Sequence, residues 1–155
     1  MSTNPYAQFT GVPMSREDID DLLVSQGYGI ISLCQEGDPY SIPISFGYDG
    51  EHVYFGFLEE SPNPTKMEYI EDGATARLLV TDIHGRFDWQ SIAVTGPVTS
   101  VDSTDEEWDH LMDTLDDNGW FIRSIEQSDA IEDIHGWKLE IDECRGIERK
   151  EEVYD

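Results

Sequence analysis

Apolar and polar residues alternate with the period of a β-strand along much of this chain. Three such stretches follow one another at residues 28–35, 40–48 and 52–58. Turn residues separate them, with the sequence EGDP at 36–39 and an Asp-Gly pair at 49–50. Alternation is typical of strands with one buried face, and Asp-Gly between two of them is a hairpin signal. The pattern therefore predicts an antiparallel meander of three strands.

The apolar positions change to helical spacing in three other segments. Ser15 is a predicted N-cap, and the helix that it begins should end at Gly27. The buried stripe of this helix is expected at Ile19, Leu22 and Leu23. A second helix is predicted between the cap Asn63 and Gly73. The third should begin with a capping box at 104–107 (TDEE) and continue with an apolar face formed by Trp108, Leu111, Met112 and Leu115.

Three more strands complete the pattern, at 74–82, 91–101 and 136–142, and a polar loop at 83–88 joins the first two. Six antiparallel strands with a helix after the third favour a barrel, because closure removes exposed edges. We expect a mostly β protein with some α structure, a six-stranded antiparallel split β-barrel with flanking helices. Residues 1–13 should form an irregular N-terminal arm, 14–143 the single domain and 144–155 a charged C-terminal tail.

Charge limits the possible partners. The chain has 34 acidic and nine basic residues, a net charge of −25. Nucleic acid and anionic membranes attract cationic surfaces, so we expect neither as a partner. Because the acids are spread along a chain that also has four Trp, seven Tyr and six Phe, a folded acidic domain is favoured over disorder. It is similar to salt-adapted proteins, with an ordinary acidic mesophile as the alternative. Without a signal or membrane-spanning pattern, the expected location is the cytoplasm.

Most familiar catalytic motifs are missing from the sequence. It contains no GxGxxG, no GxxxxGK[ST] and no GxSxG, and its four histidines and two cysteines have no metal-ligand spacing. We therefore predict no metal site and assign no catalytic residue. Cys34 is expected to be a buried, inert thiol of the first strand. His84, in the polar loop, is the one histidine of interest.

Three segments are candidate binding residues. Thr65 and Lys66 begin a predicted helix, where free backbone N–H groups bind anions, so they are candidates for a phosphate site. Alternatively, Lys66 pairs with a nearby glutamate. The stretch 40–45 (YSIPIS) offers an apolar wall with a proline in a strand, which suits a flavin ring or a simple core strand. The segment 89–91 (WQS) could approach the same ligand or close a loop.

The order of these segments resembles the pyridoxamine 5′-phosphate oxidase-like family of flavin-binding split β-barrels, over roughly residues 15–142. The matching stretches are GIISLCQEGDPYSIPISFGYDGEHVYFGF, PTKMEYIEDG, ATARLLVTD and DWQSIAVTGPVTSV. The resemblance implies a homodimer with FMN at the subunit interface. It places the isoalloxazine ring against Tyr40, Ser41, Ile42, Pro43, Ile44 and Ser45. It also places Phe55 and Gly56 near the ribityl chain, Thr65 and Lys66 at the phosphate, and Trp89, Gln90 and Ser91 on the ring from the other subunit.

Two departures from the family pattern matter. Thr65 stands where strong phosphate binders of the family add an arginine, and residues 143–155 lack the Trp and Arg signature of true pyridoxine phosphate oxidases. We therefore expect an FMN-dependent oxidoreductase with a small-molecule substrate or electron donor, and not a vitamin B6 oxidase. The alternatives are a reductase that binds deazaflavin F420 in the same barrel and a non-catalytic flavin-binding protein.

Overall fold

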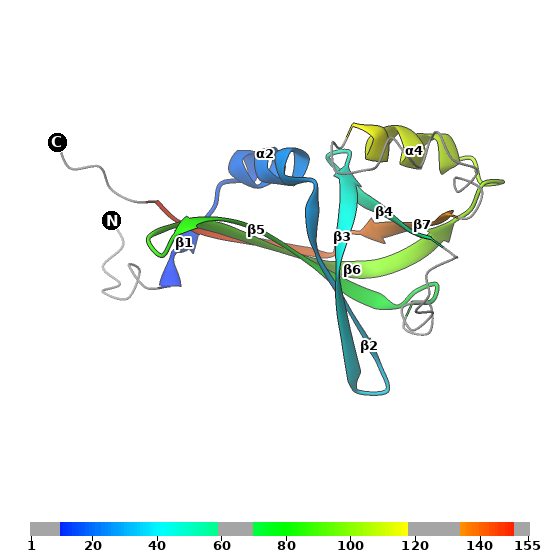
Figure 1. The fold of residues 1–155 in the computed structure, drawn as a ribbon, viewed down its shortest axis with the longest axis horizontal. Helices are drawn as coiled ribbons and strands as arrows, with labels where there is room; N and C mark the ends of the chain where they lie inside the picture. Colours follow the sequence, from blue (N-terminus) through cyan, green and yellow to red (C-terminus); the bar gives the residue numbers. More distant parts are fainter. Residues whose placement is uncertain (1–9, 59–69, 118–133, 151–155) are drawn as a thin grey trace.

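The computed structural model describes residues 10–58, 70–117 and 134–150, and its centre is a six-stranded antiparallel barrel (Figure 1). The strand order around the barrel is β6-β5-β2-β3-β4-β7, and the pairing of β6 with β7 closes it. This confirms the fold class expected from the sequence. The six strands are β2 (Tyr28–Gln35), β3 (Asp38–Tyr48), β4 (His52–Leu58), β5 (Thr75–Gly85), β6 (Asp88–Val101) and β7 (Ile134–Glu140).

Two strands change partner along their length, and this splits the barrel. β6 pairs with β8 (Glu143–Arg149) through residues 89–95 and with β7 through residues 98–101. β3 pairs with β2 through residues 38–45 and with β4 only through residues 46–48. At the change in β6, a Cβ atom added to Gly96 would overlap the carbonyl oxygen of Glu140. The chain therefore needs glycine at this position for the strands to cross.

The expected charged tail from residue 144 begins instead with strand β8, which pairs with β6 and with β1 (Val12–Pro13). Its inward positions are Cys144, Gly146 and Glu148, so the segment shows no apolar alternation. Gly146 lies under α2, because a Cβ atom there would be 2.7 Å from Cγ1 of Ile19. The expectation missed β8 because the helix above it requires a small residue where a strand pattern would show a large apolar one.

Helix α2 (Arg16–Gln26) forms as predicted. The Ser15 hydroxyl accepts a hydrogen bond from the Asp18 N–H at 3.1 Å, and Gly27 ends the helix with a φ of 71°. Ile19, Leu22 and Leu23 are the buried residues of this helix, which Figure 1 shows lying above the sheet. Helix α2 is thus attached to the barrel wall through these three side chains.

Helix α4 (Trp108–Asp116) packs over β3, β4 and β7. Leu111 and Leu115 are fully buried, as their spacing predicts. The predicted capping box is wrong: Glu107 is the N-cap and its side chain makes no capping bond. The Thr104 hydroxyl instead donates to Asp102 Oδ1 at 2.6 Å, in a turn before the helix. The predicted helix from residue 63 lies mainly in 59–69, outside the described residues.

The core lies inside the barrel, and one cysteine does not belong to it. The largest fully buried barrel side chains include Phe46, Phe55 and Leu139. Cys34, expected to be buried, is exposed. It shares the outward side of β2 with Tyr28 and Ile30, because residues two apart on a strand point the same way. No helix among the described residues is long and apolar enough to span a membrane.

Candidate functional site

The predicted flavin wall, residues 40–45, lies within the continuous strand β3. Tyr40 and Ile42 pack against the core and Ile44 is buried, whereas Ser41, Pro43 and Ser45 are on the outward side. The six side chains therefore divide between the two faces of the strand. A ligand on the outside of the barrel would therefore meet mainly the outward side chains.

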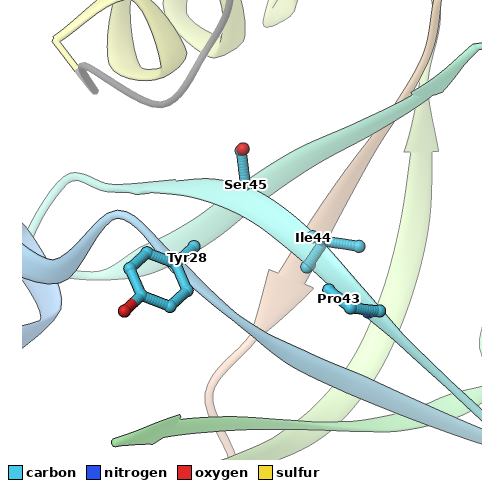
Figure 2. A pocket seen from close by; sticks show the side chains of 4 residues that line it. All are labelled: Tyr28, Pro43, Ile44 and Ser45. Atoms are coloured by element: carbon cyan, nitrogen blue, oxygen red, sulfur yellow. The ribbon is translucent and has the colours of Figure 1, made fainter. Parts of the chain in front are cut away.

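An open pocket of about 260 Å³, which we call the β3 pocket, lies on this outward side. It is lined by Tyr28 of β2 and by Pro43, Ile44 and Ser45 of β3 (Figure 2). Tyr28 is directly opposite Ser45 in the strand register and is 44% exposed. Sequence analysis did not single out Tyr28, although the hairpin register places it beside Ser45. The lining is mainly apolar, with one phenol and one hydroxyl as its polar side-chain groups.

Among the described residues, no strand pairs with residues 41–44 along one edge of β3. Because β4 pairs with β3 only through residues 46–48, it does not cover the backbone of residues 41–44 on that edge. Pro43 lies in this stretch and pairs with Ile30 on the other side. An uncovered strand edge presents both donors and acceptors. The site thus combines an apolar wall with backbone hydrogen-bonding groups.

The other predicted ligand residues of β4 and the following helix have different positions. Phe55 is 0% exposed and contacts Phe57 edge to face inside the barrel, with ring centroids 5.5 Å apart. Gly56 is half-buried and pairs with Gly136 of β7. Thr65 and Lys66, the predicted phosphate residues, lie outside the described residues. Their role stays a prediction.

Trp89, Gln90 and Ser91 are at the start of β6, three strands away from β3 in the sheet. Ser91 is on the same outward side as Ser45, but β2 and β5 lie between their strands. At about 4.8 Å per strand, the separation is roughly 14 Å. One chain therefore does not place Trp89, Gln90 and Ser91 in contact with the β3 pocket.

A second pocket, of about 310 Å³, lies at the β5–β6 hairpin. Nε2 of His84 is 3.0 Å from Oδ2 of Asp82, and Gln90 donates to Glu148 at 2.9 Å. His84 sits at a β-bulge, since Ile83 pairs with Trp89 and Gly85 with Asp88. Most of its lining residues are polar or charged: Asp82, His84, Asp88, Trp89, Gln90 and Lys150.

The outward side of the sheet is almost free of acidic residues. We define the outer face as every second residue of 28–34 in β2, 39–45 in β3, 77–83 in β5, 89–95 in β6 and 143–149 in β8. Glu143 is its only acid, although 34 of the 155 residues of the chain are acidic. Apolar side chains on it are exposed by 37–70%: Tyr28, Ile30, Leu79, Ile83 and Ile147. A surface that is apolar and lacks acids differs from the rest of this chain.

Two titratable clusters lie away from both pockets and attach helices to the barrel. Burial, together with the 2.7 Å hydrogen bond that Tyr48 donates to Asp20 of α2, raises the pKa of Tyr48 to about 12. Burial alone would raise the pKa of Asp49. Hydrogen bonds from His110 of α4, at 2.8 Å, and from two backbone N–H groups outweigh that effect, so the pKa of Asp49 is below its usual value. Among the described residues, no group of three potential ligands could hold a metal ion.

Solved structures with the same fold include several that bind redox cofactors. The FAD and heme binding protein from Mycobacterium smegmatis superposes with a TM-score of 0.69 at 22% identity, covering 91% of this chain and 74% of that one. An FAD-binding protein from Mesorhizobium loti gives a TM-score of 0.69 at 19% identity, covering 90% and 97%. At these identities the likeness shows a shared fold.

Sequence comparison assigns the family. An uncharacterised protein from Rhizobium meliloti is 21% identical over 91 residues, which span 59% of this chain and 58% of that protein. The model of the pyridoxamine 5′-phosphate oxidase family matches residues 15–148, from the N-cap of α2 almost to the end of β8. This match covers the whole barrel, and the chain belongs to the pyridoxamine 5′-phosphate oxidase family.

Proposed function

We propose that this chain is a flavin-dependent oxidoreductase that binds FMN at the β3 pocket. The observation that carries the proposal is the apolar pocket of Tyr28, Pro43, Ile44 and Ser45 beside the edge of β3 with which no described strand pairs. The isoalloxazine ring has two flat apolar faces and a polar pyrimidine edge. The pocket wall suits the faces, and backbone groups of residues 41–44 suit the edge.

The protein's task would be to bind and orient the cofactor, because a bound flavin itself supplies the redox chemistry. Pro43 and Tyr28 would contact the ring and exclude water from one side of it. Thr65 and Lys66 would hold the phosphate at the start of a helix. Among the described residues that line the β3 pocket, the Tyr28 phenol is the one titratable side chain, so we propose that protons are exchanged with solvent.

We further propose that the protein is a homodimer joined through the outer face. In a chain with net charge −25, two copies can approach closely only where acids are few, and the outer face has Glu143 alone. Its exposed apolar side chains would be buried by the second copy. Trp89, Gln90 and Ser91 of that copy could then reach the β3 pocket, which they do not reach within one chain.

The identity of the flavin has two further candidates. The names of similar structures favour FAD, since both the Mycobacterium smegmatis and Mesorhizobium loti proteins are described as binding it. Deazaflavin F420 carries a polyglutamate tail, which a chain of net charge −25 would repel. We therefore rank F420 below FMN and FAD.

An absorbance spectrum of the purified protein in molar KCl, followed by chromatography of the ligand released by heat, tests the cofactor. Flavin bands and released FMN are expected, whereas FAD or F420 would identify the other candidates. A colourless protein that also fails to bind added flavins would refute the proposal. Turnover with reduced nicotinamide nucleotides and artificial acceptors would then separate an oxidoreductase from a non-catalytic flavin-binding protein.

The dimer is tested by light scattering coupled to size-exclusion chromatography. Leu79→Glu adds a charge to the outer face and is expected to give a monomer with weaker flavin binding. Val24→Glu is the matched control, since Val24 is 67% exposed on α2 and off the outer face. A Leu79→Glu protein that remains a dimer would rule out the outer face as the interface.

A further inference from the structure

The strand register arranges part of the outer face in two neighbouring rows of different character. One row crosses β6, β5, β2 and β3 and is apolar: Ala93, Leu79, Ile30 and Pro43. The next row is two residues away along each strand and is polar: Thr95, Arg77, Ser32 and Ser41. Residues two apart on a strand are separated by about 7 Å, so the two rows border one another. The apolar row ends in the β3 pocket, and the polar row ends on the β3 edge with which no described strand pairs.

Arg77 is the charged residue of the polar row, and it has no anionic partner. Its Nε donates a hydrogen bond to Thr95 Oγ1 at 3.0 Å, and its side chain is exposed. Among the described residues, no carboxylate forms a salt bridge with Arg77. Glu143, the acid of the outer face, pairs instead with Arg145 at 3.1 Å. The remaining N–H groups of the Arg77 guanidinium thus have no acceptor within the described part of the chain.

The proposed dimer would take this guanidinium out of water. A buried guanidinium is stabilised when it gains an anionic acceptor, and it lowers stability when it gains none. The outer face cannot supply this anion, because it has three arginines and one acid: Arg77, Arg145, Arg149 and Glu143. Two copies of the face double the excess of positive charge. Arg77 must then be compensated by an acid from outside this face or by a bound anionic group.

The surroundings of Arg77 favour a bound group. Arg77 is directly opposite Ser32, and the hydroxyl oxygens of Ser32 and Ser41 are 2.8 Å apart. Ser41 is two residues from Pro43 of the β3 pocket. At about 4.8 Å per strand, Arg77 and Ser41 are roughly 10 Å apart. A flavin ring has flat apolar faces and one polar pyrimidine edge, and an apolar row beside a polar, cationic row matches both.

We propose that Arg77, together with the hydroxyls of Ser32 and Ser41, binds the pyrimidine edge of the flavin and stabilises its reduced form. This inference rests on the proposed function, since it needs a flavin at the β3 pocket. A hydride donor is oxidised by passing two electrons and one proton to the neutral oxidised ring, which thereby gains one negative charge. A guanidinium held beside the ring and away from bulk water interacts more strongly with that charged form than with the neutral one. Arg77 should therefore raise the midpoint potential of the bound flavin.

The midpoint potential of the flavin-loaded, full-length protein, measured in molar KCl against reference dyes, tests this proposal. Arg77→Gln should bind reduced flavin about 10-fold more weakly relative to oxidised flavin, since it removes a charged hydrogen bond. A ratio of 10 corresponds to a potential about 30 mV lower for a two-electron couple. Arg77→Lys keeps the charge but loses the paired N–H donors, so it should restore part of the potential.

Lys150→Gln is the control for the change in net charge. Lys150 follows β8, is not part of the outer face and has a side chain that is 65% exposed. Its loss should leave the potential at the wild-type value, and equal potentials in Arg77→Gln and Lys150→Gln proteins would overturn the proposal.

Two other results for Arg77→Gln would also overturn it. Loss of the preference for FMN over riboflavin would place the charge of Arg77 at the phosphate. A monomer that keeps the wild-type potential would place Arg77 in an ion pair across the dimer interface. A wild-type protein that binds no flavin would refute the proposed function and this inference with it. An unchanged potential in flavin-loaded Arg77→Gln protein would refute the inference alone.

Discussion

Substitution of Gly96 by alanine should open the barrel, because this residue lies where β6 changes partner from β8 to β7. An added Cβ atom would overlap the carbonyl oxygen of Glu140, and it would lie 2.8 Å from the Glu140 carbonyl carbon and 3.1 Å from the Asp142 nitrogen. Ordinary contacts begin near 3.4 Å, so the contact with the carbonyl carbon alone requires a shift of about 0.6 Å, and the overlapping oxygen requires a larger one. All three obstructing atoms belong to the backbone and cannot rotate away.

The expected cost follows from overpacking and from strained hydrogen bonds. Overpacking a closed site costs about 1–3 kcal/mol. Displacement of this connection also strains the hydrogen bond that Asp142 N–H donates to the Thr95 carbonyl oxygen, which is 3.0 Å long. Loss of this hydrogen bond costs about 1 kcal/mol of stability. A total near 3 kcal/mol corresponds to a fall in melting temperature of about 6–12 °C for a domain of this size.

Circular dichroism in molar KCl can measure this change, with Gly85→Ala as the control. A Cβ atom at Gly85 has nothing within 4 Å, and φ there is outside the left-handed region. The control should therefore match the wild type or exceed it slightly, because alanine restricts the unfolded chain. If Gly96→Ala melts within about 1 °C of Gly85→Ala, the crossing does not require glycine and our account of the split barrel fails.

Three further predictions concern charge. Melting temperature should rise from 0.01 M to molar KCl, because the Debye length falls from about 30 Å to about 3 Å and screens the surface acids; an unchanged value would contradict salt adaptation. The raised pKa of Tyr48 gives stability that is complete below about pH 10 and lost as pH rises through about 12. Urea denaturation of Tyr48→Phe should show a smaller alkaline loss than the wild type, and equal losses would exclude Tyr48 as its source. The lowered pKa of Asp49 gives stability that is present above about pH 4 and is lost as the pH falls through the lowered pKa. Asp49→Asn should therefore lower the urea midpoint more at pH 7 than at pH 3, and a loss of equal size at both pH values would point to packing instead.

Sequence reasoning succeeded where one local signal determined an element. Ser15 and Gly27 mark the ends of α2 through their own side-chain and backbone chemistry, and the structure shows the Ser15 capping bond and the left-handed φ of Gly27. The alternation in 28–35 and 52–58 gives β2 and β4 with their predicted bounds. Such signals act over a few residues and do not depend on distant contacts.

The failures share a different cause, since each depends on what packs against the segment. β8 was missed because α2 requires glycine at position 146, which no local pattern of β8 shows. The burial of Cys34 was misjudged because the choice of inward side follows from the register with β3 and β5. Tyr28 joins the β3 pocket through the same register. Segment 83–88 was expected to be a polar loop. Strands β5 and β6 extend into it, so that only Arg86 and Phe87 remain in the turn.

The acidic composition helps to locate a binding surface on the molecule only when it is combined with the strand register. A net charge of −25 excludes some partners but does not indicate where the protein binds anything. The register sorts the residues of five strands into two sides, and the outward side is almost without acids. Selection for an acidic surface would favour Asp and Glu at any position exposed to solvent. Ile30 and Leu79 are exposed in one chain yet apolar, which is what the proposed dimer interface requires. The Leu79→Glu and Val24→Glu pair tests this reasoning, because it predicts that equal added charge has unequal effects on the two faces.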